Sequence, residues 1–308
     1  MTADLSEATA PPATGGVVHL LSFDVEEYFQ VEAAREGGVA AEAWPQWPRR
    51  LDGAVETILA LLDAHGVRAT FFILGWVARH EAPLVRRIAE AGHEIASHGM
   101  THAMLDRLGP EGFRDELDES RRLLEDLGGR RVLGFRAPTF SVTHRTAWAL
   151  DVLEQAGYAY DSSIFPVRHD RYGVPEAPPE PHVAVGPGGG RVLEIPPMTA
   201  PLLGQNLPVG GGGYLRLLPV GLLGRRLRGL ERGRQSGMIY LHPWEFDPGQ
   251  PVLPMSRLSR WRHRVNLART GPKLAWLLKR FRFGGAGERL DALRAGARRE
   301  FVYGNGSQ

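Results

Sequence analysis

The chain has 308 residues, of which 43% are hydrophobic, and it contains no cysteine. This length and composition are ordinary for a globular protein with a large core, and they exclude disulfide bonds and thiolate metal ligands. No apolar run approaches the roughly 18 residues of a membrane-spanning helix, and residues 1–16 lack the basic start and apolar stretch of a secretory signal. The sequence therefore predicts a cytoplasmic protein in which any metal ion is bound by histidine and carboxylate groups.

Charge is spread unevenly along the chain. The formal net charge is only +2, but the segment from Arg257 to the C-terminus contains thirteen arginine and lysine residues against three acidic ones. We interpret this segment first as a solvated basic helical face. The alternative is a surface for an anionic polymer, a membrane or an envelope polysaccharide assembly complex. We expect no nucleic-acid partner.

Apolar runs that suit buried strands alternate with segments of helical periodicity. The expected strands lie at residues 19–23, 67–74, 94–97, 132–136, 158–161, 192–195 and 238–242, and the expected helices at 51–65, 84–89, 112–127, 145–155 and 215–234. The Pro- and Gly-rich stretch 168–190 is typical of a long loop. This alternation predicts an α/β fold with a parallel sheet, open or closed into a barrel, whose reactive side chains lie where strands end.

Two pairs of polar residues at expected strand ends have the spacing of a metal site. Asp24 and Glu26 alternate in an extended segment, so both carboxylates face one cleft, where they need a cation or a proton between them. His98 and His102 have the i, i+4 spacing that stacks two imidazoles on one face of a helical turn. One carboxylate and two imidazoles leave a position open for water, as in catalytic zinc sites. Either pair alone is more often a coincidence.

His242 closes the expected strand 238–242 and is a candidate general acid. Without further context, the interpretation as a hydrogen-bonded histidine at the edge of the core is favoured. The remaining eight histidines have no matched partners, and we interpret them as structural or solvated.

Four motifs occur in order along the chain: FDVE at 23–26, HGMTH at 98–102, RAPTF at 136–140 and LH at 241–242. Together with TFFILG at 70–75, they resemble the successive motifs of the NodB-type polysaccharide deacetylases, the carbohydrate esterases of family four. HPWEFDP at 242–248 and RHRVNL at 262–267 resemble a bacterial subfamily associated with exopolysaccharide export and exosortase loci. The resemblance implies a distorted (β/α) barrel of the polysaccharide deacetylase type with a mostly helical C-terminal extension.

The resemblance also suggests how the chain is divided. We expect a disordered lead at residues 1–16, a catalytic domain at 17–250, a basic extension at 251–303 packed on the barrel, and a frayed tail at 304–308.

The resemblance implies a role for each polar residue of the motifs. Asp24 would be the catalytic base and Arg136 its ionic partner, while His242 would be the general acid, supported by Asp161. A backbone N–H near Phe140 would stabilise the oxyanion.

The metal ligands implied by the resemblance are Glu26, His98 and His102, with zinc as the expected ion. The chain departs from the family here, because Val25 separates the two acids and Glu26 replaces an aspartate.

The groove for the substrate is implied by a further set of residues. Pro138, Phe140 and Trp244 would form its wall, and the flat face of Trp244 would stack on a sugar ring. Ser162 stands where the family commonly has a tryptophan, which changes one part of this wall.

We therefore expect a metal-dependent hydrolase that removes N-acetyl groups from an amino-sugar polysaccharide in bacterial exopolysaccharide biosynthesis or export. One alternative is an allantoinase-like amidohydrolase for small ureides on the same fold, against which the long loop and the Trp244 region favour an extended groove. The other is a carbohydrate-binding relative that has lost its metal, against which the retention of all candidate residues counts.

Overall fold

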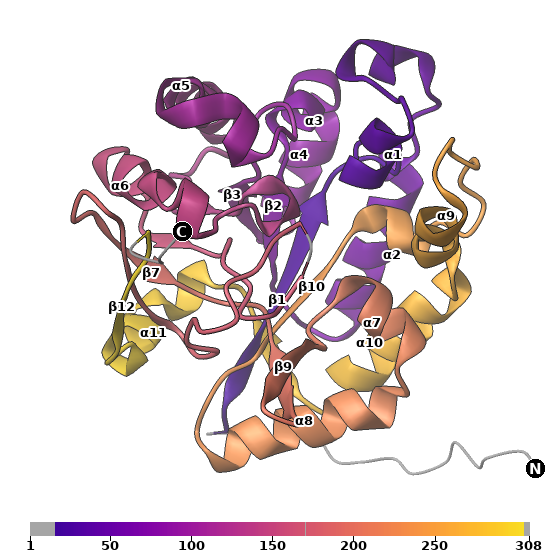
Figure 1. The fold of residues 1–308 in the computed structure, drawn as a ribbon. Helices are drawn as coiled ribbons and strands as arrows, with labels where there is room; N and C mark the ends of the chain where they lie inside the picture. The colour runs from indigo at the N-terminus through magenta and orange to yellow at the C-terminus, as the bar shows by residue number, and fades with distance from the viewer. Residues whose placement is uncertain (1–15, 170, 305–308) are drawn as a thin grey trace, which may run out of the picture.

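A ten-stranded sheet organises the computed structural model, which describes residues 16–169 and 171–304 (Figure 1). In sheet order its strands are β10 (Met238–Leu241), β1 (Val18–Val25), β2 (Thr70–Ile73), β3 (Glu94–Ser97), β4 (Gly134–Phe135), β5 (Tyr160–Asp161), β7 (Arg191–Glu194), β6 (His182–Val185) and β12 (Glu300–Val302), with β11 (Arg282–Gly284) beside the start of β1. The predicted lead and tail, apart from Gly16 and Gly304, lie outside the described residues.

The sheet curves into an almost closed barrel. All neighbouring strands are parallel except β6 and β7, and a single bridge between Pro197 and Met238 joins the β7 side to β10. Strands β1, β2 and β10 are buried along almost their whole length, because their mostly apolar side chains face the barrel interior on one side and helices on the other. This architecture confirms the predicted distorted (β/α) barrel.

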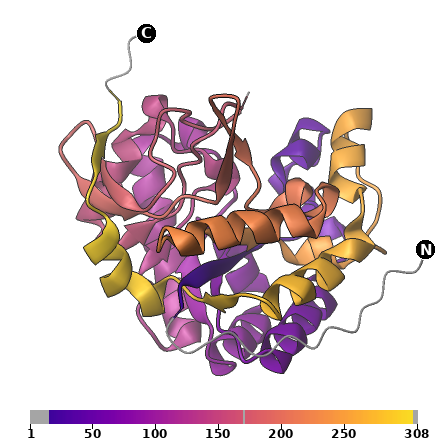
Figure 2. The ribbon, with the colours of Figure 1, turned by 90° about the horizontal axis from the view of Figure 1, so that it is seen from below.

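Helices cover the outside of the sheet. They are α1 (Glu32–Glu36), α2 (Leu51–Ala64), α3 (Gly75–His80), α4 (Ala82–Glu90), α5 (Leu105–Gly128), α6 (Trp148–Gln155), α7 (Gly212–Leu217), α8 (Val220–Arg232), α9 (Arg257–Arg264), α10 (Thr270–Leu278) and α11 (Leu290–Gly296). Figure 2 shows α8 crossing the lower end of the barrel, with α10 and α11 on either side. No helix among the described residues combines the length and hydropathy that crossing a membrane requires.

Two local predictions were wrong. The single helix expected at 215–234 is broken between α7 and α8, because Pro219 forces Leu218 into an extended conformation (φ −74°, ψ 146°). The loop expected at 168–190 contains β6, whose short alternating run is hidden among prolines and glycines. A two-stranded hairpin, β8 (Thr199–Leu202) and β9 (Gln205–Pro208), also precedes α7.

The region after residue 250 is built into the barrel rather than attached to it. It contributes three helices, and it also adds β11 to β1 and β12 to β6. Helix α10 packs closely on α8 at Gly224, where a Cβ atom would lie 2.9 Å from the Trp276 ring. The residue-250 boundary stays a prediction.

Candidate active site

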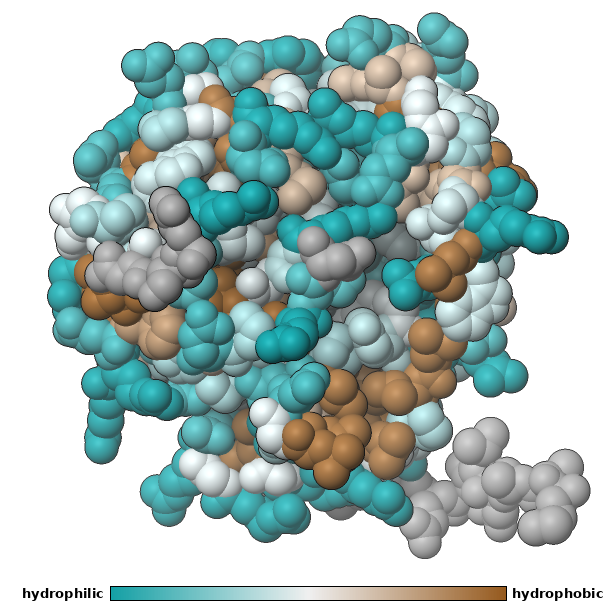
Figure 3. Space-filling view, in the orientation of Figure 1, coloured by the Kyte–Doolittle hydropathy of each residue, from teal (hydrophilic) through white to brown (hydrophobic). Residues whose placement is uncertain are grey.

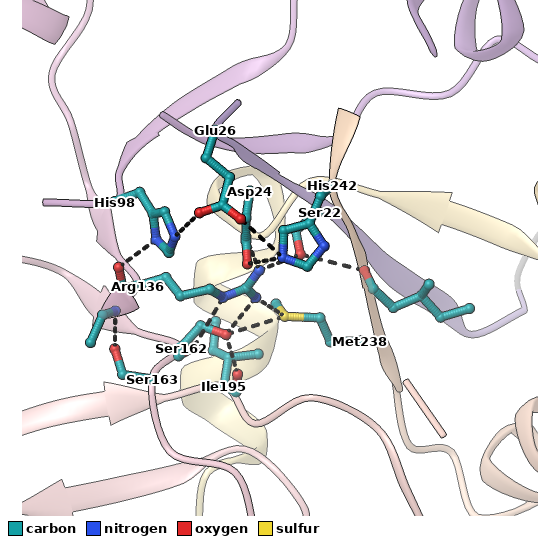
Figure 4. Close-up of polar contacts among 12 residues, drawn as sticks. Ser22, Asp24, Glu26, His98, Arg136, Ser162, Ser163, Ile195, Met238 and His242 are labelled. Atoms are coloured by element: carbon teal, nitrogen blue, oxygen red, sulfur yellow. Dashed lines mark hydrogen bonds and ion pairs between the residues drawn. The ribbon is translucent and has the colours of Figure 1, made fainter. Parts of the chain in front are cut away.

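Asp24 and Arg136 form a buried ion pair at the carboxyl ends of β1 and β4. The Arg136 Nη1 donates to Asp24 Oδ1 at 2.5 Å and to the Ser22 hydroxyl at 2.9 Å, and Nη2 donates to the Ser162 hydroxyl at 2.8 Å (Figure 4). The guanidinium also lies 4.1 Å from the centre of the Phe72 ring. These contacts fix the guanidinium on several sides, so it orients the Asp24 carboxylate and balances its charge.

Glu26, His98 and His102 converge beside this pair. One ligand atom from each lies within 4.8 Å of the others, and all three side chains are buried. Glu26 Oε2 is 2.5 Å from His102 Nε2 and 3.8 Å from His98 Nε2, and it has no further partner among the described residues. A buried carboxylate oxygen facing two imidazole nitrogens is the donor set that a divalent ion such as zinc requires.

The segment that carries the two histidines is a loop, and the helical turn predicted for it was wrong. Gly99 (φ 74°) and His102 (φ 56°) both adopt left-handed backbone conformations, which fold His102 back toward His98. Glu116 of α5 holds this loop, because its Oε2 accepts hydrogen bonds from the backbone N–H groups of residues 100 and 101 at 2.8 and 3.3 Å. The Thr101 hydroxyl donates to the other Glu116 oxygen.

The electrostatics of the cluster favour the deprotonated forms of Glu26 and His98 and the protonated form of His102. Burial raises the pKa of Glu26, but the imidazoles of His102, His242 and His98 outweigh it and hold the pKa at about 2. Burial lowers the pKa of His98 to about 4, and its Nδ1 lies 2.8 Å from the Arg136 carbonyl, which leaves Nε2 facing Glu26. Burial also lowers the pKa of His102, but the Glu26 carboxylate outweighs this effect and raises it. A divalent ion would take the place of the proton that His102 and Glu26 otherwise share.

His242 follows β10 and completes the other side of the site. Its Nε2 lies 3.9 Å from Asp24 Oδ2 and 3.8 Å from Glu26 Oε1. Its Nδ1 lies 2.9 Å from Glu245 Oε1, which also accepts the His242 backbone N–H at 3.0 Å. Burial lowers the pKa of His242, but Glu245, Glu26 and Asp24 together raise it.

The predicted support of His242 by Asp161 was wrong. Asp161 accepts a hydrogen bond from the Ser163 hydroxyl, and its carboxyl group interacts with that of Glu194, its neighbour on β7. Asp161 pairs with Phe135 at the end of β5, whereas Glu245 reaches His242 from only three residues away, within the short 3₁₀ helix Pro243–Phe246.

A buried arginine links Glu245 to the C-terminal region. Arg216 of α7 donates to Glu245 Oε2 at 2.8 Å, and its other nitrogens donate to the backbone carbonyls of residues 262, 263 and 265 at 2.9 to 3.1 Å. The end of α9 therefore fixes the guanidinium that holds the carboxylate behind His242.

The predicted groove residues differ in their positions. Trp244 lines the cleft, but it is only 8% exposed and its ring stacks on His242 and His263 at 4.9 and 4.3 Å between ring centres, so the predicted stacking on a sugar ring was wrong. Phe140 lines the cleft, whereas Pro138 lies behind the metal loop next to Gly99.

The space above these residues is large enough for several sugar rings. A cleft of about 780 Å³ has Asp24, Glu26, His98 and His102 in its lining. The Phe140 backbone N–H already donates to the Ala137 carbonyl at 3.0 Å, so this N–H is not the predicted oxyanion donor.

Sequence reasoning missed Glu245, Arg216 and Glu116. The i, i+3 spacing of His242 and Glu245 was a usable signal, since a short helical turn brings such residues together. Neither Arg216 nor Glu116 lies near a motif, and only the tertiary fold brings them to the site.

Comparisons with known proteins divide the chain into two parts. Residues 46–160 match the polysaccharide deacetylase family, and residues 162–291 match a domain family of unknown function, DUF3473. The chain is 36% identical over 112 residues to the peptidoglycan deacetylase-like protein FGM2 of Gibberella zeae, which covers 36% of this chain and 32% of that protein. It is 36% identical over 106 residues to a chitooligosaccharide deacetylase of Sinorhizobium fredii, covering 33% of this chain and 45% of that protein. The matches thus span less than half the length of these relatives.

The fold is also similar to a solved structure over its whole length. A putative polysaccharide deacetylase from Mycobacterium smegmatis superposes with a TM-score of 0.57 at 19% identity, covering 94% of each chain. The candidate site draws Asp24 and Glu26 from before the first matched region, the two loop histidines and Arg136 from within it, and His242 from the DUF3473 region. The chain therefore contains a polysaccharide deacetylase domain at residues 46–160, and the DUF3473 region that follows completes both the sheet and the candidate active site.

Proposed function

We propose that this protein is a metal-dependent hydrolase that removes N-acetyl groups from an amino-sugar polysaccharide, with zinc as the ion. The observation that carries the proposal is the placement of Asp24 and His242 next to a Glu26–His98–His102 cluster, each with its own buried charged partner. A base, an acid and a cation site within one cleft are the parts that amide hydrolysis needs.

Each side chain has a defined part in this reaction. A bound divalent ion would polarise the acetyl carbonyl and lower the pKa of a water molecule. Asp24, oriented by Arg136, accepts the proton of that water as its oxygen bonds to the acetyl carbon. His242 donates a proton to the sugar nitrogen as the C–N bond breaks, which yields acetate and a free amine. Glu245 accepts from Nδ1 of His242 and keeps Nε2 directed at the cleft.

The size of the cleft and the names of the relatives support a sugar polymer as the substrate. The cleft is far larger than a small ureide needs, and the relatives include chitooligosaccharide and peptidoglycan deacetylases. A role in exopolysaccharide biosynthesis or export, contact with an envelope assembly complex and a cytoplasmic location are also part of the proposal. They rest on the resemblance of the motifs and on the sequence features described above.

The proposal is tested with zinc-loaded protein and a panel of acetylated chito-oligosaccharides, acetylated polymers and allantoin, with products identified by mass spectrometry. We expect loss of acetyl groups from the sugars and no turnover of allantoin. His98→Ala and His102→Ala should lose both bound metal and activity, while His65→Ala on the far end of α2 should retain both. Full metal content in the two site variants, or turnover of allantoin alone, would contradict the proposal.

A further inference from the structure

Two groups of exposed apolar side chains flank the mouth of the cleft. The first lies on the β8–β9 hairpin and α7, where Leu203 is 95% exposed and Leu202, Leu207 and Leu217 are also exposed. Figure 3 shows apolar side chains gathering over the hairpin and α7. We call this group the hairpin rim.

The second group lies across the cleft, on α9 and the segment before it. Trp261, Leu258 and Val252 are 53%, 55% and 56% exposed. Leu258 and Trp261 are three residues apart on α9, so they share one side of the helix. We call this group the α9 rim. In Figure 2 the hairpin and α9 both reach the upper side of the view, which is the face turned toward the viewer in Figure 1.

The leucine at the tip of the hairpin has both a side chain and a backbone conformation that are unfavourable if the tip is surrounded only by water. Leu203 and Gly204 form its two-residue turn with φ values of 50° and 77°. Asparagine, aspartate and glycine are favoured at such positions, since a leucine side chain is strained in the left-handed region. Leu203 belongs to no hydrophobic cluster of the described residues, so it gains no burial within the chain.

The α9 rim is also strongly basic. Arg257, Arg260 and Arg262 are exposed, and none of them forms an ion pair with a carboxylate in the described part of the chain. Unpaired guanidinium groups next to an exposed tryptophan are typical of surfaces that lie at the headgroup level of a bilayer.

Both rims are continuous with the cleft. The lining of the cleft includes Leu217 of the hairpin rim and its neighbour Tyr214 on α7. It also includes Trp261 of the α9 rim and the adjacent Arg262. A surface that rests on the two rims would therefore lie directly over the mouth of the site.

We propose that the two rims form a docking surface for an anionic lipid bilayer. The leucines of the hairpin rim and the apolar residues of the α9 rim enter the boundary of the acyl chains, and the arginines of α9 contact headgroup phosphates. A hydrated acidic polysaccharide would pair with the arginines but leave the leucines in water. A second copy of the chain would cover the leucines but bring unpaired arginines of like charge together. A bilayer satisfies both features.

The absence of cysteine allows a direct test in the full chain. Single Leu203→Cys, Leu258→Cys and Glu90→Cys variants are labelled with an environment-sensitive dye. Glu90 lies at the end of α4, which packs on β3, on the opposite side of the barrel from the β7–β10 seam. We expect vesicles of phosphatidylcholine and phosphatidylglycerol to shift the emission of the labels at 203 and 258 to the blue, and to leave the label at 90 unchanged.

Vesicle flotation measures the strength of the interaction. Leu202→Asp combined with Leu203→Asp should reduce binding by about tenfold or more, because burying one leucine alone is worth roughly that factor. Each of Arg257→Gln and Arg260→Gln should reduce it by about fivefold at low salt and by less at high salt. Circular dichroism checks that these surface variants stay folded.

Several outcomes would overturn the inference. Equal dye shifts at all three positions would overturn it, and so would the absence of any shift with anionic vesicles. A shift of the labels at 203 and 258 with soluble alginate, but not with vesicles, would also overturn it. A label already shielded without vesicles, together with a dimer mass by light scattering, would assign the rims to a second copy instead. These measurements use no substrate, so they are independent of the chemistry proposed for the cleft.

Discussion

At the scale of single residues, the site depends on buried carboxylates with different partners. Asp24 faces Arg136, Glu26 faces two imidazoles, and Glu245 lies between His242 and Arg216. Each charge is balanced inside the protein, which is what allows so many ionisable groups to be buried close together. The reactive atoms are thereby held before any substrate arrives.

A substitution at Glu245 can remove the charge that orients His242 without changing the packing around it. Glu245→Gln keeps the size of the side chain but loses the negative charge at Nδ1 of His242. We expect kcat to fall by about 100-fold, the usual contribution of a positioned acid, with little change in KM. Glu245→Asp should recover part of the loss. Both constants come from steady-state kinetics on the acetylated substrate, in which the deacetylated product is quantified.

A matched control for this variant is Glu300→Gln, which removes an exposed carboxylate paired with Arg191 on the far side of the sheet. Its kinetic constants should equal those of the parent protein. Equal activity of Glu245→Gln and the parent would show that His242 needs no carboxylate behind it.

The buried carboxyl groups of Asp161 and Glu194 should make the stability of the protein depend on pH. Burial raises the pKa of Asp161 to about 6, and burial together with the neighbouring Asp161 carboxylate raises the pKa of Glu194 well above its usual range. We infer that the two carboxyl groups share a proton. A carboxyl group with a raised pKa in the folded state contributes stability at low pH. This contribution is lost as the pH rises through the folded-state value.

We therefore expect the free energy of unfolding to fall by about 1–3 kcal/mol between about pH 5 and about pH 8 through this pair. Glu194→Gln keeps a hydrogen bond to Asp161 without a second charge, so its unfolding free energy should change less over the same range. Urea denaturation of both proteins at the two pH values measures the difference. An equal dependence on pH in both would mean that the pair does not share a proton.

At the scale of elements, the metal loop depends on α5. Glu116 accepts two backbone N–H groups and a hydroxyl from the loop that holds His98 and His102. Glu116→Ala should lower zinc affinity by about 10- to 100-fold, the typical cost of losing a group that orients metal ligands. Competition with a zinc chelator measures the affinity. Glu119 lies on α5 like Glu116 and forms an exposed ion pair with Arg79 of α3, so Glu119→Ala should leave the zinc affinity unchanged.

The elements also show what the sequence can predict. Long apolar runs predicted most of the parallel strands, and the polar residues directly after β1, β3, β4 and β10 lie at one end of the barrel, as expected. The loop at 98–102 and the break at Pro219 were missed, because left-handed residues and one proline override helical periodicity locally. Glu245 replaced Asp161 at His242 because a strand register, which no motif records, sets where Asp161 points.

At the scale of the whole molecule, the C-terminal region and the barrel support each other. β11 extends the sheet along β1, the strand that carries Asp24, and Arg216 joins the end of α9 to Glu245. Lys273 of α10 donates to the carbonyls of residues 215, 216 and 218. The residues after 250 are therefore bonded to the elements that position both the base and the acid.

This mutual support predicts that the chain unfolds as one unit. A protein that ends at residue 250 would leave the buried Arg216 without its carbonyl partners and would expose the side of β1 that β11 covers. Removing partners from a buried charge costs about 3–5 kcal/mol, a large part of the stability of a domain. We expect the truncated chain to lack a cooperative thermal transition, and the full chain to show a single one by calorimetry. Two separate transitions in the full chain, or a folded 1–250 fragment, would instead support an independent catalytic domain with an appended extension.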